Sequence, residues 1–135
     1  MDSYFKKCIE VSYALLGKHG DYRCKHFSFI FLKNRLISIG INNPYKTHPR
    51  NLEIGFYSRS GEDISTTVGV HSELSAILKL GEQDCSKFTL VNTRINRNNQ
   101  IDLSKPCKSC YSLVKQLNFK KIFYSTNDNN FIKLE

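Results

Sequence analysis

The chain has 135 residues, of which 40% are apolar and 24% are charged. That length suits a single domain spanning residues 1–135, and the apolar fraction allows a buried core without disulfides or repeats. No stretch approaches the ~20 consecutive apolar residues that a membrane span requires. We therefore expect one cytoplasmic domain that does not contact a membrane.

Basic residues outnumber acidic residues, 20 to 12, and give a formal net charge of +8. Such an excess attracts phosphate groups, either of a free nucleotide or of a nucleic acid. The basic residues are scattered singly or in pairs, however, which is equally typical of a solvated basic surface. Charge alone therefore leaves both interpretations open.

The first third of the chain predicts a helix and then a hairpin. Residues 2–16 place one set of side chains at the spacing of an amphipathic helix. The set is Phe5, Cys8, Ile9, Ser12 and Leu16. Aromatic and β-branched residues then fill 25–41, with a break at Asn34 and Arg35. This pattern predicts two antiparallel strands.

The remaining chain predicts alternating helices and strands. We expect a helix from near His71 to Gly81, a strand at 88–91, a helix from Cys107 to Gln116, and strands at 122–124 and 131–132. The caps and apolar spacing of these segments support the assignments. Together they fit an α/β fold, a three-layer α/β/α sandwich with a mixed central sheet of about five strands.

A segment of roughly thirty residues between Asn42 and Gly69 lacks clear periodicity. Loops of that length inside a compact domain are commonly functional or disordered. This one carries several basic and aromatic residues, including Lys46, Arg50 and Arg59. It could border a substrate pocket, or it could be a mobile surface loop.

Two short motifs carry the candidate chemistry, His71-Ser72-Glu73 and Pro106-Cys107-Lys108-Ser109-Cys110. A catalytic zinc ion takes three protein ligands and keeps a fourth position for water. His71, Cys107 and Cys110 can supply those three ligands. The two cysteines share one face at the start of the expected helix, where exposed amides favour the thiolate that binds metal. His71 fits if it also lies at a helix start.

Glu73 is interpreted as a proton carrier. Zinc lowers the pKa of a bound water, and a nearby carboxylate can take up and return its protons. The alternative is an ordinary acidic residue in a first helical turn. A shuffled chain would contain about 0.18 His-x-Glu triplets and about 0.004 Pro-Cys-x-x-Cys runs, so chance is a poor explanation of both.

Other metal sites are less well supported by the cysteine pattern. A structural zinc site closes all four positions with protein, and no second Cys-x-x-Cys pair is present. Cys24 and His26 could join Cys8 or Cys85 in an additional site. Buried free cysteines explain these residues better.

The two motifs resemble the signature of the cytidine and deoxycytidylate deaminase superfamily, His-x-Glu followed by Pro-Cys-x-x-Cys. The similarity also covers the hairpin end Gly40-Ile41-Asn42 and the segment from Ser104 to Ser125. Compact phage and virus-encoded deoxycytidylate deaminases resemble the chain most. The residue between His and Glu is commonly alanine in this superfamily. Ser72 departs from that pattern, and the swap should leave the zinc geometry intact.

The resemblance implies a cytidine deaminase-like fold in which His71, Cys107 and Cys110 bind zinc and Glu73 shuttles protons. It also implies a homo-oligomer, and a location in the host cytoplasm if the chain is viral. The further candidates for substrate contact are Asn42 for the sugar, Lys46, Arg50 or Arg59 for a phosphate and, for a polynucleotide substrate, Tyr111 and Tyr124 for stacking on a base. Asn42 could instead be a turn residue, and Tyr124 could belong to the core.

Three functions compete. The first is hydrolysis of the amino group of a cytosine nucleotide or nucleoside, with dCMP converted to dUMP as the leading case because the chain is short. The second is a polynucleotide deaminase that takes a cytosine or adenine from single-stranded DNA or RNA. The third is a zinc-stabilised binding module without catalysis. A carboxylate beside the metal argues against the third, because a structural site does not need one.

Overall fold

The computed structural model describes residues 3–16, 25–42, 72–81, 84–105, 114–115 and 117–134. Its elements are α1 (Ser3–Ala14), β1 (Lys25–Leu32), β2 (Arg35–Ile41), α3 (Ser72–Leu80), β3 (Phe88–Ile95), β4 (Lys121–Ser125) and β5 (Phe131–Lys133). The five strands form one sheet in the order β2-β1-β3-β4-β5. β3 and β4 are parallel, whereas the other neighbouring pairs are antiparallel. The predicted mixed sheet of five strands is confirmed.

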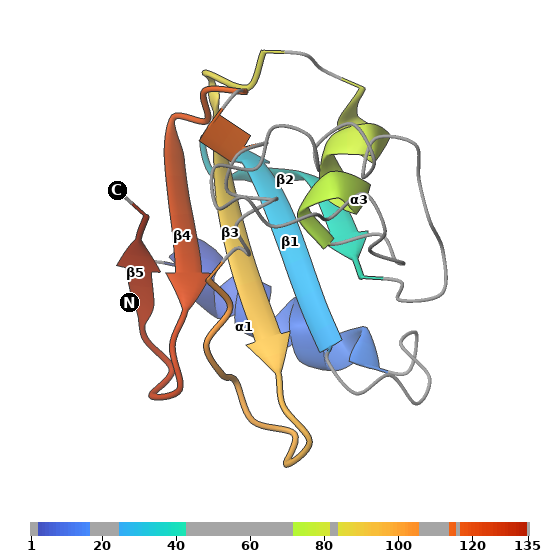
Figure 1. The fold of residues 1–135 in the computed structure, drawn as a ribbon, viewed down its shortest axis with the longest axis vertical. Helices are drawn as coiled ribbons and strands as arrows, with labels where there is room; N and C mark the ends of the chain where they lie inside the picture. The colour runs from blue at the N-terminus through green and yellow to red at the C-terminus, as the bar shows by residue number, and fades with distance from the viewer. Residues whose placement is uncertain are drawn as a thin grey trace, which may run out of the picture.

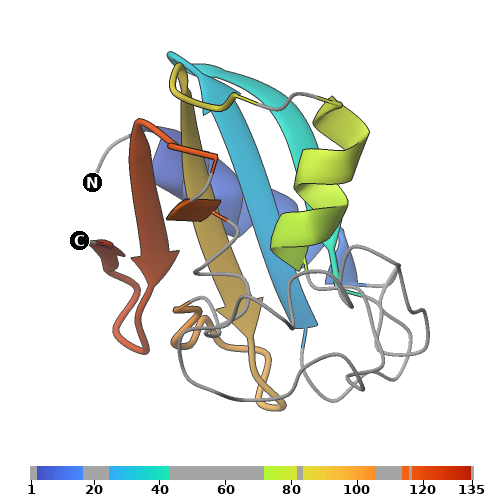
Figure 2. The same ribbon diagram turned by 45° about the horizontal axis from the view of Figure 1, so that its top comes forward.

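Helices α1 and α3 cover opposite faces of this sheet (Figure 1). Figure 2 shows the same arrangement from a second direction, with the sheet between the two helices. The described elements therefore form the three layers that the sequence predicts. No helix in the described part of the chain is long and apolar enough to cross a bilayer.

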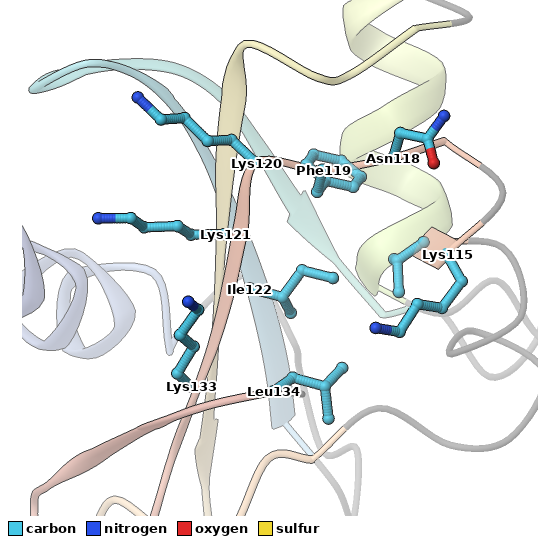
Figure 3. A pocket seen from close by; sticks show the side chains of 9 residues that line it. Lys115, Asn118, Phe119, Lys120, Lys121, Ile122, Lys133 and Leu134 are labelled. Atoms are coloured by element: carbon cyan, nitrogen blue, oxygen red, sulfur yellow. The ribbon is translucent and has the colours of Figure 1, made fainter.

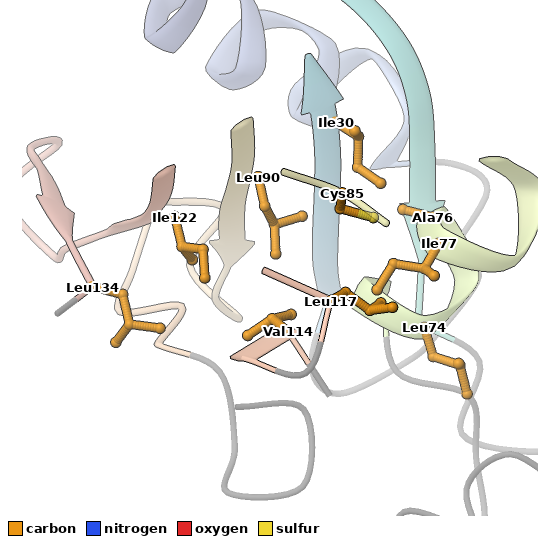
Figure 4. Close-up of a cluster of buried hydrophobic side chains, with 10 residues drawn as sticks. All are labelled: Ile30, Leu74, Ala76, Ile77, Cys85, Leu90, Val114, Leu117, Ile122 and Leu134. Carbon is orange, nitrogen blue, oxygen red and sulfur yellow. The ribbon is translucent and has the colours of Figure 1, made fainter. Parts of the chain in front are cut away.

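The strands bury side chains on both faces because consecutive residues point to opposite sides. Phe27, Phe29 and Phe31 of β1 pack on the α1 side with Cys8 of that helix. Ile30 packs on the other side, with Leu90 and Ile122 of the neighbouring strands and Leu74 and Ile77 of α3. Figure 4 shows this second cluster. Cys8 and Cys85 therefore lie in different cores, and both are buried, as expected.

Helix α1 follows its sequence pattern closely. Cys8 and Ser12 are buried, and Phe5 stacks on Phe131 with ring centroids 4.4 Å apart. The Ser12 hydroxyl forms a hydrogen bond of 2.6 Å with the Thr93 hydroxyl of β3. The one polar residue in the buried stripe of α1 is thus matched by a polar residue of the sheet.

Several boundaries differ from the sequence prediction. The hairpin turns at Lys33 and Asn34, one residue earlier than expected, with Lys33 at a positive φ of 56°. β3 continues to Ile95, because its polar residues Asn92 and Thr93 find buried hydroxyl partners. Of the helix expected from Cys107 to Gln116, Val114 and Lys115 are described and are helical. The rest of that helix, and the segment after Asn42, lie outside the described residues.

Gly40 sets how closely α3 approaches the sheet. A Cβ atom at this position would overlap the backbone of Ser72 and Ala76, on the first turns of α3. Gly81 instead ends α3 with a positive φ of 74°, as its position after the last apolar residue predicts. One glycine thus permits contact, and the other permits a backbone turn.

Replacing Gly40 with alanine should destabilise the fold by about 1–3 kcal/mol, because α3 must move away from β2 to make room. Urea unfolding measures this loss. Gly81→Ala is the matched comparison: it meets no neighbouring atom and should cost only about 1 kcal/mol for its backbone conformation. Equal effects of the two substitutions would contradict the close approach at Gly40.

Candidate active site

The face of the sheet beneath α3 changes from apolar to polar along the strands. Ile30, Leu90 and Ile122 align in one row across β1, β3 and β4. The next row, two residues along each strand, contains Ser28, Asn92 and Tyr124 together with Gly40 of β2. Beyond it, His26 pairs with Arg94, and the Asn42 amide donates to the His26 carbonyl at 3.3 Å. Polar groups therefore gather at the end of the sheet formed by the C-terminal ends of β2, β3 and β4.

A buried chain of hydrogen bonds joins this polar row to α3. The Ser28 hydroxyl lies 2.7 Å from Asn92 Oδ1 and 2.8 Å from the Ser72 hydroxyl. The Ser72 hydroxyl lies 3.0 Å from Glu73 Oε1. All four side chains are buried, and Glu73 is only 5% exposed. A buried carboxylate is costly without hydrogen-bond donors, so this chain helps to make the burial of Glu73 tolerable.

The chain has three links, but its two hydroxyls carry one proton each. One end must therefore donate the third proton. Asn92 can do so by turning its amide nitrogen towards Ser28, since an amide carries donors as well as an acceptor. Ser28 can then donate to Ser72, and Ser72 donates to the Glu73 carboxylate.

Asn92 also anchors the segment that leads to the cysteine motif. Its backbone carbonyl accepts a hydrogen bond of 2.8 Å from the Ser104 hydroxyl. The Ser125 amide at the end of β4 donates to that same hydroxyl at 2.8 Å, and the Ser104 amide donates to the Ser125 carbonyl at 3.0 Å. Ser104 precedes Cys107 by three residues, and Ser72 directly follows His71. Ser104 is therefore bonded to Asn92 directly, and Ser72 is connected to it through Ser28.

Three of the predicted site residues are described, and they share one end and one face of the sheet. Glu73 lies in the first turn of α3 and is joined to β1 through Ser72. Asn42 follows β2, and its Oδ1 accepts a hydrogen bond of 2.9 Å from the His26 amide. Tyr124 is half-buried against the core on the α3 side, so part of its ring is a core contact.

The remaining predicted residues lie outside the described residues: His71, Lys46, Arg50, Arg59, Cys107, Cys110 and Tyr111. Within the described ranges, no group of three or more His, Cys, Asp or Glu side chains forms a metal site. What is described fits a zinc site in one respect. The Glu73 carboxylate is buried, Ser72 is bonded to β1, and Ser104 is bonded to the neighbouring strand β3, so the described residues that flank the two motifs are held by adjacent strands.

Arg94 is a cation at this edge that the sequence analysis did not select. It is half-buried, and its Nε is buried and has no hydrogen-bond partner among the described residues. Asp102 is nearby and interacts with the Arg94 charge, while the Leu103 amide and the Asn96 side chain donate to its two oxygens at 2.7 and 3.2 Å. These hydrogen bonds, the one from Leu103 first, lower the pKa of Asp102. Arg94 is therefore a candidate partner for an anionic ligand.

A cavity of about 340 Å³ lies at the other end of the sheet, where β4 begins. Its floor includes Phe119, Ile122 and Leu134, and lysines surround it (Figure 3). The Lys121 and Lys133 side chains point away from Ile122 and Leu134, since residues alternate between faces along the strands. The lysines do not converge on one point, and the cavity is separate from the Glu73 site.

Comparison with solved structures agrees with this arrangement. A dCMP deaminase from the cyanophage S-TIM5 aligns with 93% of this chain and 86% of its own, with a TM-score of 0.57 and 17% identity. A cytidine deaminase from Burkholderia pseudomallei covers 100% of this chain and 93% of its own, with a TM-score of 0.60 and 13% identity. The chain has a cytidine deaminase-like fold.

A cytidine deaminase from Mycobacterium leprae supports the same conclusion, with a TM-score of 0.56, 14% identity, and coverage of 98% of this chain and 94% of its own. No family model matches the sequence, and no curated protein sequence matches it. The similarity therefore lies in the fold, and the chemistry has to be argued from the residues.

The sequence analysis also missed Ser28, Asn92 and Ser104, and a signal for two of them was present. Ser28 interrupts a run of aromatic and aliphatic residues in β1, and Asn92 follows three apolar or β-branched residues in β3. A polar residue inside a buried strand needs a partner, so such interruptions mark candidate networks. No comparable signal marked Ser104, which lies in an irregular segment.

Removing the Ser104 hydroxyl should loosen the segment that leads to Cys107. Ser104→Ala leaves the Asn92 carbonyl and the Ser125 amide short of a buried partner, which costs about 1–3 kcal/mol. We expect a lower free energy of unfolding and up to about a 10-fold weaker affinity for zinc, measured by competition with a chelator. Ser86→Ala, at an exposed position, should change stability by less than about 0.5 kcal/mol. Unchanged zinc affinity in Ser104→Ala would contradict this anchoring role.

Proposed function

We propose that this protein is a zinc-dependent hydrolytic deaminase that converts a cytosine nucleotide, with dCMP as the leading substrate, to the uracil form and ammonia. The observation that carries the proposal is the double anchoring on Asn92. Its side chain connects through Ser28 and Ser72 to Glu73, and its carbonyl holds Ser104 before the cysteine motif. Glu73, the proposed proton carrier, and Ser104, which precedes the proposed cysteine ligands, are thus both connected to Asn92.

The residue roles follow from the chemistry of the site. Zinc held by His71, Cys107 and Cys110 would lower the pKa of a water molecule and supply the nucleophile. Glu73 would take one proton from that water and deliver it to N3 of the cytosine ring. It would then take the remaining proton of the oxygen that has bonded to C4 and deliver it to the amino group, which leaves as ammonia as the C4 carbonyl forms. Its burial supports this role, because a fixed carboxylate away from bulk solvent exchanges protons with the bound water and the substrate and not with the surrounding solvent.

Substrate recognition would use the polar edge of the sheet. Asn42 would contact the sugar, with its side chain fixed by the hydrogen bond from the His26 amide. Tyr124 would stack on the base, and Lys46 and Arg50 stay candidates for binding the phosphate. Arg94 adds a described cation to this set. The solved cyanophage S-TIM5 dCMP deaminase in complex with dCMP and dUMP supports a nucleotide as the first substrate to test.

The partner we propose is therefore a small cytosine nucleotide. Binding to a single-stranded nucleic acid and assembly into a homo-oligomer stay predictions from the charge and from the resemblance. A polynucleotide substrate requires tight, salt-sensitive binding to single strands. Single-stranded DNA and tRNA are therefore tested beside the free nucleotides.

Zinc-loaded wild-type protein should release ammonia from dCMP, and Glu73→Ala should reduce turnover by at least about 100-fold with one zinc still bound. The measurement is ammonia release from dCMP, dCTP, cytidine, deoxycytidine, single-stranded DNA and tRNA, together with zinc analysis of each variant. Glu10→Ala, at an exposed position of α1, is the control and should keep full activity. Full zinc occupancy without deamination of any substrate would favour the non-catalytic binding module.

If Arg94 binds the substrate phosphate, Arg94→Ala should raise KM for dCMP by about 10-fold or more, as expected when a hydrogen bond to a charged group is lost. Deoxycytidine, which lacks the phosphate, should be affected by less than about 2-fold. Arg97→Ala provides a matched control, because Arg97 is exposed just beyond the end of β3. Equal losses on dCMP and deoxycytidine would rule out a phosphate contact and assign Arg94 a structural role.

A further inference from the structure

Ser72 makes hydrogen bonds in two directions at the start of α3. Its hydroxyl is 3.0 Å from Glu73 Oε1 on one side and 2.8 Å from the Ser28 hydroxyl on the other. Ser72 is 2% exposed, and Ser28 is fully buried. The Ser72 hydroxyl therefore connects the Glu73 carboxylate to Ser28 of β1, and all three side chains are buried.

The support beneath Ser72 is rigid. Ser28 lies on β1 between β2 and β3, and the Ser28 hydroxyl is held by Asn92 of β3 at 2.7 Å. The Asn92 carbonyl is in turn bonded to Ser104 at 2.8 Å. On the neighbouring strand β2, Gly40 lets the first turns of α3 come into backbone contact. The position of the Ser72 hydroxyl is therefore set by two central strands and by the close approach of α3.

A glutamate side chain needs such support for a precise task. It has several rotatable bonds, and fixing them costs conformational entropy. Misplacing a reacting group by about 1 Å can cost about 100-fold in rate. A donor at one carboxylate oxygen restricts the rotation of the whole group and so sets the direction of the second oxygen. An alanine at position 72 offers no donor.

We propose that Ser72, supported by Ser28 and Asn92, is a positioning residue that holds the Glu73 carboxylate in its productive orientation. The inference rests on the proposed function, in which Glu73 moves protons. It gives Ser72 a specific role: where a small apolar residue would only fill space, the serine connects the carboxylate to the sheet. Ser28 and Asn92 act through Ser72 and do not touch the substrate.

The test compares Ser72→Ala with Ser38→Ala in the zinc-loaded protein. Ser38 is a matched control, because it is also buried and its hydroxyl also bonds α3, donating to the Ala76 carbonyl at 2.7 Å. Each substitution removes one buried hydroxyl at the contact between the sheet and α3. We expect Ser72→Ala to lower kcat for dCMP by about 10- to 100-fold, with KM changed by less than about 2-fold. Ser38→Ala should change kcat by less than about 2-fold.

A second variant tests the connection through Ser28. Ser28→Ala should lower kcat less than Ser72→Ala, because the bond from Ser72 to Glu73 is kept. In the double variant the effects should not add, since both substitutions break one chain. Equal kcat losses in Ser72→Ala and Ser38→Ala, or fully additive effects of Ser28→Ala and Ser72→Ala, would overturn the proposal.

Infrared spectroscopy of the protein labelled with ¹³C-glutamate provides a readout that does not depend on turnover. The Glu73 carboxylate band is identified by its loss in Glu73→Gln. We expect Ser72→Ala to shift that band and Ser38→Ala to leave it in place. An unshifted band in Ser72→Ala overturns the positioning role. If Ser72→Ala shifts the band but the wild-type protein deaminates no substrate, the contact between Ser72 and Glu73 is upheld and the proposed function is rejected.

Discussion

The structure of this site depends on the need to satisfy polar groups that are buried under α3. Asn92 lies in the centre of the sheet and is 2% exposed, so its amide and its carbonyl both require partners. Ser28 meets the first requirement and Ser104 meets the second. These partners link β1, β3 and the segment at Ser104, and Ser28 extends the connection to Ser72 of α3.

The same requirement explains why the two faces of the sheet differ. On the α1 side, Ser12 and Thr93 bond each other, and Ser12 also bonds the Cys8 carbonyl, among mostly apolar neighbours. On the α3 side, the polar row continues outward to His26, Arg94 and Asn42. An apolar row beneath it, including Leu90, packs against α3 and anchors the helix. The apolar clusters thus hold both helices on the sheet, and the polar row at the strand ends is available for chemistry.

Much of this architecture could be predicted from the sequence. The helical spacing of Cys8 and Ser12 predicts the buried side of α1, and the aromatic and β-branched run over 25–41 predicts the hairpin of β1 and β2; both are confirmed. The motif pointed to Glu73 as a site residue, and the structure places it in a first helical turn with its carboxylate buried. Its chemical role stays a prediction.

Other features could not be predicted, because they depend on contacts between distant segments. The sequence gives no register between β1 and β3, so the pairing of Ser28 with Asn92 was invisible, and β3 was predicted to end too early. Ser72 was interpreted as a neutral replacement of alanine, since its partner Ser28 lies 44 residues away. The zinc ligands and the basic segment after Asn42 stay predictions, because they lie outside the described residues.

We propose that the two motifs build one three-ligand zinc centre with Glu73 beside it. Anomalous diffraction above and below the zinc absorption edge, from crystals of the zinc-loaded protein, tests this centre. We expect one zinc peak bonded to His71 at about 2.0–2.1 Å and to Cys107 and Cys110 at about 2.3 Å, with the fourth position open to water. A peak elsewhere, or a fourth protein ligand that closes the site, would contradict it.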